Sequence, residues 1–187
     1  MPLDCSYNSL IQGTLQCRKT IGGVRKSYGA DWQDIATCTV VDGIITFIAL
    51  AGGAEFAVLE YDDDNTASYN QEGTRNGLDF RVNQTATLKF TGATKDKVVI
   101  ANKAKGIHKG FWLHLQNDGT IHSQGVELNA DGDEGVASTV GAKVNPNVNS
   151  NTGEGSSDVT YNIVATSSDF LPCSMTEAAL DALSDIS

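Results

Sequence analysis

The chain has 187 residues, with 13 Lys and Arg against 23 Asp and Glu, which gives a formal charge of -10. Its hydrophobic content of 40% is enough for a buried core and excludes a wholly disordered chain. The acidity excludes a protein that holds nucleic acid through phosphate contacts, because such contacts need clustered Lys and Arg. The charge is also uneven, since residues 110–187 hold one basic side chain, Lys143, against 11 acidic ones.

The beginning of the chain predicts an irregular arm over residues 1–21, followed by Gly22-Gly23 at the entry to a strand. The first residues lack the basic stretch followed by an apolar stretch that marks a signal peptide, so no signal peptide is predicted. The longest apolar run, residues 44–51, is too short to cross a membrane, which needs about 20 residues. The four cysteines form no C-x-x-C pair, which favours free thiols and leaves a bridge between Cys5 and Cys17 open.

Alternating apolar and polar residues predict a β core over residues 22–129 and 158–172. Asp42-Gly43 is a tight-turn dipeptide between residues 36–41 and 44–50, which predicts a hairpin. A second hairpin is predicted from residues 110–116 and 120–124. The other predicted strands are residues 24–28, 55–61, 78–82, 85–90 and 158–166, with a further extended stretch after residue 66 that ends at a turn over residues 73–77.

Three segments depart from this alternation of apolar and polar residues. Residues 94–105 have helical spacing, with Thr94 as N-cap and Gly106 as the stop. Residues 130–157 are rich in Gly and Asn and contain Pro146, which predicts a long flexible loop. Residues 174–185 open with a capping-box pattern and predict a terminal helix. The sequence therefore predicts a single mainly β domain, an antiparallel barrel or sandwich with one flanking helix and a short C-terminal helix.

No catalytic, cofactor-binding or metal-binding constellation is present, so neither an enzyme nor a cofactor is expected. Phosphate-cradling and nucleophile-elbow motifs are missing, and the acidic run 129–134 fails the calcium-loop pattern. His114 and His122 face each other if residues 117–119 form a three-residue turn. If residues 118–119 form a two-residue turn, the pair does not form.

Residues 17–28, Cys-Arg-Lys-Thr-Ile-Gly-Gly-Val-Arg-Lys-Ser-Tyr, resemble a strand near the start of structural proteins of tailed bacteriophages. The later signals follow the order seen in tail-tube and tube-like proteins: hairpin, strands, short helix, Asn117-Asp118-Gly119 and a closing strand. The resemblance implies a virion protein, assembled in the host cytoplasm, that forms a homo-oligomeric ring (a hexamer) and contacts other virion tail proteins. It also implies a channel through which DNA passes without specific binding.

Two charged sets follow as candidates for this role. The acidic set is expected to face the channel and repel phosphate: Glu127, Asp131, Asp133, Glu134, Glu154 and Asp158. The basic set is expected to contact a neighbouring subunit: Arg18, Lys19, Arg25 and Lys26. The alternatives are another virion module, namely a head–tail connector ring, a capsid decoration protein or a fibre-attachment protein, and then a binding domain or a metal-dependent enzyme.

Overall fold

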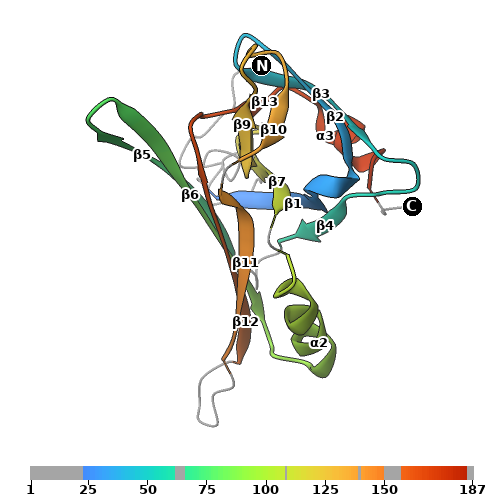
Figure 1. The fold of residues 1–187 in the computed structure, drawn as a ribbon. Coiled ribbons are helices and arrows are strands. Elements are labelled where there is room, and N and C mark those ends of the chain that lie inside the picture. Colours follow the sequence, from blue (N-terminus) through green and yellow to red (C-terminus); the bar gives the residue numbers. More distant parts are fainter. Residues whose placement is uncertain (1–22, 62–65, 108, 139, 150–156, 185–187) are drawn as a thin grey trace, which may run out of the picture.

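The computed structural model describes residues 23–61, 66–107, 109–138, 140–149 and 157–184 (Figure 1). The fold is mainly β, as the sequence predicts. In chain order the elements are β1 (Val24–Asp31), a 3-10 turn (Trp32–Asp34), β2 (Ile35–Val41), β3 (Ile44–Leu50), β4 (Ala57–Glu60), β5 (Thr66–Asn76), β6 (Asp79–Thr91), α2 (Lys95–Ala104), β7 (Gly110–Gln116), β8 (Ile121–Gln124), β9 (Val126–Leu128), β10 (Gly135–Ala137), β11 (Val140–Asn149), β12 (Asp158–Ser167), β13 (Pro172–Cys173) and α3 (Glu177–Asp181).

One half of the molecule is a curved sheet in the order β2-β3-β13-β8-β7-β1-β4, which does not close into a barrel. The strands curve around a first apolar core, and α3 contributes Leu180 to it (Figure 1). The buried members of this core are Tyr28, Cys38, Val40, Ile45, Ile48, Phe56, Phe111, Leu113, Leu115, Ile121, Val126, Leu171, Cys173 and Leu180.

The other half is the long antiparallel array β11-β12-β6-β5, which joins β7 at the pair Ala142↔Gly110. Helix α2 lies beside β11 and β12 and covers the second core (Figure 1). The buried members of this core are Ala86, Leu88, Ala101, Trp112, Ala142, Val144, Val159, Tyr161, Ile163 and Ala165.

Strand β7 belongs to both halves. Its side chains alternate between the two faces of the sheet, so Phe111, Leu113 and Leu115 enter the first core. Trp112 enters the second core, and His114 is also fully buried. Six of the seven residues of β7 are therefore buried.

The two strongest local signals in the sequence are confirmed. Asp42 and Gly43 both have positive φ, 52° and 75°, and join β2 to β3 as the dipeptide predicts. Helix α2 begins after Thr94, whose side chain accepts a hydrogen bond from the Lys97 N–H. Within this helix Ala101 is buried, whereas Val99 and Ile100 are exposed.

The prediction of one long loop over residues 130–157 is wrong, because the whole of β10 and the whole of β11 lie within it. Pro146 lacks an N–H and signals a break, but it lies opposite Tyr161 on a strand whose other side meets β7 at Ala142 alone. Beyond that point β11 is an edge strand, where proline removes no ladder hydrogen bond. Residues 150–156 lie outside the described residues.

Two boundaries also differ from prediction. β5 continues through residues 73–76, and the chain turns at Gly77 and Leu78, between the paired residues Asn76 and Asp79. Helix α3 is shorter than residues 174–185, and its N-cap is Thr176. Ser174 instead donates its backbone N–H to the carbonyl of Ile45, which ties the segment before the helix to β3.

Candidate functional site

The most unusual surface feature is the β5–β6 hairpin, which projects away from the curved sheet (Figure 1). Its turn places Gly77 at the first central position with φ of 65°, as a type II′ turn requires. The second central residue is Leu78, whose side chain is fully exposed. A Gly-X pair after Asn76 is the sequence signal that could have placed this turn correctly.

Other apolar groups accompany Leu78. The rings of Phe80 and Phe170 pack against each other with centroids 6.0 Å apart, yet they remain 37% and 46% exposed. Strand β5 is also the last strand of its sheet, and among the described residues it pairs only with β6. The hairpin therefore offers both an exposed apolar tip and an open strand edge, two features that folded chains normally cover by association.

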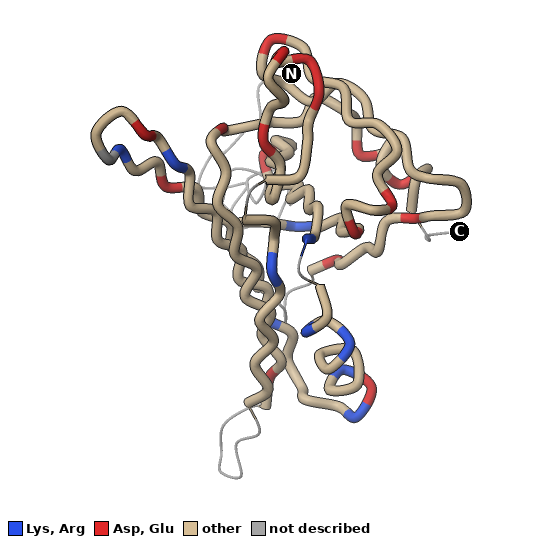
Figure 2. The backbone as a smooth tube through the Cα atoms, in the orientation of Figure 1, with Lys and Arg blue, Asp and Glu red and all other residues tan. Residues whose placement is uncertain are grey.

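The predicted channel-facing acidic set does not form one surface. Asp131, Asp133 and Glu134 are exposed together at the β9–β10 turn, and Glu127 is half-buried on β9. Asp158 is the first residue of β12, at the end of the β11–β12 pair away from β10, where it is 7% exposed and pairs with Lys89 at 3.1 Å. Figure 2 shows that acidic residues (red) are scattered over several parts of the chain. Glu154 lies outside the described residues.

The acidic β9–β10 turn is held by its own polar groups. The Asn129 Oδ1 accepts hydrogen bonds from the backbone N–H groups of Gly132, Asp133 and Glu134 at 2.7, 3.1 and 3.3 Å. Gly132 has a positive φ of 77°, which lets the chain curl around that oxygen. The side chains of Asp131 and Glu134 are left facing solvent.

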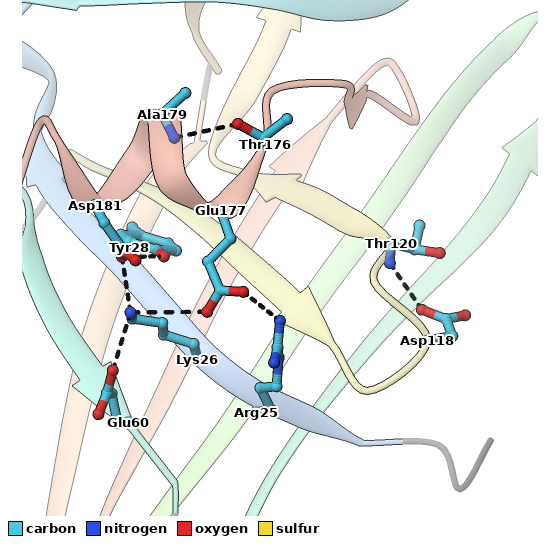
Figure 3. A network of polar contacts seen from close by, with 10 residues as sticks. All are labelled: Arg25, Lys26, Tyr28, Glu60, Asp118, Thr120, Thr176, Glu177, Ala179 and Asp181. Atoms are coloured by element: carbon cyan, nitrogen blue, oxygen red, sulfur yellow. Dashed lines mark hydrogen bonds and ion pairs between the residues drawn. The ribbon is translucent and has the colours of Figure 1, made fainter. Parts of the chain in front are cut away.

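The basic residues expected between subunits are bound within the chain where the structure describes them (Figure 3). The Lys26 ammonium lies 2.7 Å from Asp181 and 2.9 Å from Glu60, and Arg25 pairs with Glu177. Lys26 is only 5% exposed, so its charge is not available to a neighbouring subunit. Arg18 and Lys19 lie outside the described residues.

This ion-pair network fastens α3 to β1. Burial alone would lower the pKa of Lys26, but hydrogen bonds to Asp181 and Glu60 outweigh it and raise that pKa above its ordinary value. Asp181 also accepts a hydrogen bond from the Tyr28 hydroxyl at 2.6 Å. Burial would raise the pKa of Asp181, and the bonds from Lys26 and Tyr28 lower it instead. Asp181 is 155 residues from Lys26 in sequence, so no local pattern reveals the network.

Strands β7 and β8 pair His114 with His122, so the turn between them is the three-residue turn over residues 117–119. His114 sits in a chain of hydrogen bonds: its Nδ1 lies 2.9 Å from Ser27 Oγ and its Nε2 lies 2.9 Å from Gln124 Oε1. The Gln124 amide nitrogen donates to the carbonyls of Gln84 and Ile163. Gln124 Oε1 must then accept, so Nε2 of His114 carries the proton and Nδ1 accepts from Ser27.

This arrangement holds His114 neutral. Burial lowers its pKa to about 4, and the Gln124 hydrogen bond opposes that shift only in part. Tyr61 donates to Ser27 Oγ at 3.2 Å, which leaves the Ser27 hydroxyl hydrogen for Nδ1. Over the described residues no cluster of three or more His, Cys, Asp or Glu side chains could hold a metal ion. The network is a structural joint between β1, β7, β8, β6 and β12.

An apolar cavity of about 250 Å³ lies beneath α2. Ile100, Ala104 and Ile107 border it on the helix side, and Trp112 and Tyr161 border it on the sheet side. The cavity has almost no polar lining. It accounts for the shallow burial of α2, in which Ala101 is the one fully buried residue and Ala104 packs against the second core while partly exposed.

No protein family, curated protein or solved structure matches this chain. Among the described residues, no helix is both long and apolar enough to cross a membrane. The geometry of the chain itself must therefore support any functional proposal.

Proposed function

We propose that this chain is a structural subunit that assembles with copies of itself into rings, and that these rings form or extend the tail tube and DNA channel of a tailed phage. The observation that carries the self-assembly is the projecting β5–β6 hairpin, with Leu78 fully exposed at its tip. The resemblance of residues 17–28 to phage tail proteins supplies the virion setting.

Assembly accounts for the exposed groups of the hairpin, because contact with another copy covers them. Removing a Leu side chain from water contributes about 1.5–3 kcal/mol, and pairing an open strand edge satisfies its backbone groups. A contact between a hairpin on one copy and a different surface on the next is heterologous, so it closes into rings or continues as a filament. In such a ring we place Asp131, Asp133 and Glu134 toward the channel, because their exposed carboxylates repel phosphate.

The test compares the unmodified chain with Leu78→Asp by sedimentation velocity and negative-stain microscopy. We expect rings or tubes from the unmodified chain and a 19.8 kDa monomer from the variant, because a carboxylate cannot enter an apolar contact without a large desolvation cost. Val41→Asp is the matched control, since Val41 is also exposed beside a hairpin turn. A chain that stays monomeric at every concentration refutes self-assembly, and normal rings from Leu78→Asp refute the role of the hairpin.

A further inference from the structure

A groove of about 700 Å³ runs between β3 and α3. One wall is residues 46–50 of β3, and the other includes Met175, Ala179, Ala182 and Leu183. Side chains alternate between the faces of a strand, so five consecutive residues can border one groove only where it meets the strand at its edge. The groove is therefore a strand edge facing a mostly apolar helix.

None of the described strands pairs with this edge beyond Ile45. β3 pairs with β2 along one side, and on its other side it meets β13 only at Ile45, opposite Cys173. Within the described residues, no strand pairs with residues 46–50 on the groove side. An open edge beside a helix is the geometry in which an extended peptide adds as a further strand, with its side chains in the groove.

Composition identifies the segment that fits. Residues 5–17 contain no charged side chain and no histidine, and they include Leu10, Ile11 and Leu15. An uncharged segment enters an apolar groove without burying an unpaired charge. The other segments outside the described residues do not fit: residues 62–65 contain three aspartates, residues 150–156 contain no apolar side chain, and residues 185–187 are too short.

The sheet topology brings this segment within reach. Lys26 of β1 and Ile45 of β3 lie in one row across the sheet, through the pairs Lys26↔Leu115, Leu115↔Ile121, Ile121↔Cys173 and Cys173↔Ile45. The chain therefore enters β1 two residues before the row at which the groove begins. The order β1-β7-β8-β13-β3 separates the two by four strand spacings, about 19 Å along the sheet. The intervening residues 18–22 span up to about 17 Å when extended, and the curvature of the sheet shortens the direct path.

We propose that residues 5–17 bind in the β3–α3 groove of their own chain as an added strand on β3. This strand would cover Phe47, which is 53% exposed, together with the apolar face of α3. It would also continue, along residues 46–50, the pairing that β13 makes with β3 at Ile45. The proposal concerns a single copy of the chain and does not depend on self-assembly.

The test uses the full-length chain with a photo-crosslinking phenylalanine analogue in place of Leu10. Peptide mapping by mass spectrometry of all crosslinked products should find crosslinks to residues 46–50 or 174–183. Ala182→Arg places a guanidinium in the groove and should abolish these crosslinks. Ala178→Arg is the matched control, because Ala178 is equally exposed on α3 but does not border the groove.

Mixing isotopically light and heavy chains identifies the source of the segment. Crosslinks that join only light to light and heavy to heavy support the proposal. Mixed crosslinks overturn it by assigning the groove to another copy. Crosslinks confined to other surfaces, or groove crosslinks that survive Ala182→Arg, also overturn it.

Discussion

His114→Gln tests the hydrogen-bonded joint between the two cores. Glutamine can keep one of the two hydrogen bonds that His114 makes, but it cannot take up a proton near neutral pH. In the native chain the imidazole is fully buried and its pKa is lowered from 6.5 to about 4. The unfolded chain therefore binds a proton at a higher pH than the folded chain does.

The sign and size of the effect follow from this difference. Because the folded pKa lies below the unfolded one, the stabilising contribution is complete above about pH 6.5 and is lost as the pH falls through about 4. Each pKa unit corresponds to about 1.4 kcal/mol. Between about pH 7.5 and about pH 4.5, the native chain should lose about 2.5 kcal/mol of unfolding free energy beyond the loss in the variant.

Urea unfolding of both chains at the two pH values measures this difference, and acid effects on other groups cancel in the comparison. Equal losses in the native chain and the variant would refute a buried neutral imidazole. Nitrogen NMR of the ring gives an independent measurement if the variant does not fold. It should show His114 unprotonated at about pH 5.5, and a protonated ring at that pH would contradict the hydrogen-bond pattern.

Two further substitutions test the packing around Trp112 of β7. Gly29→Ala should destabilise the chain by about 1–3 kcal/mol in thermal or urea unfolding, because its Cβ would lie 2.5 Å from the Trp112 ring. Gly52→Ala is the control, since a Cβ there meets no atom within 4 Å. Equal effects of the two substitutions would contradict the close approach of Gly29 to Trp112. Ala104→Leu should raise the melting temperature by filling the cavity beneath α2, with a gain of about 1–2 kcal/mol in unfolding free energy. Asn102→Leu, on the exposed face of the helix, should not raise it. A lower melting temperature for Ala104→Leu would show that the cavity cannot accept a larger side chain.

Local signals predicted the elements whose geometry is set by adjacent residues. Asp42-Gly43 fixed the β2–β3 turn, and Thr94 fixed the start of α2, because both act within a few residues. Pro146 misled the prediction for β11, since its effect depends on whether the strand has a neighbour on its second side. That neighbour is determined by the whole sheet order.

The candidate surfaces were less accessible to prediction for the same reason. The sequence shows that Lys26 is charged, but only the packing of α3 on β1 shows that Asp181 and Glu60 neutralise it. Asp131 and Asp158 belong to the same acidic half of the sequence, yet they lie apart. Asp158 lies opposite Asn149, at the end of the β11–β12 pair away from the β9–β10 turn that holds Asp131. Long-range pairing decides which charges share a surface, and composition cannot supply it.

The position of β7 has a consequence for how the chain melts. Phe111 and Trp112 are neighbours in sequence and pack in different cores, so both cores lose packing contacts if the strand detaches. A calorimetric scan should then contain one endotherm, with no separate melting of the α2 side and the α3 side. A cavity or clash introduced on one face of this strand weakens the whole molecule, because the two cores share a single cooperative unit.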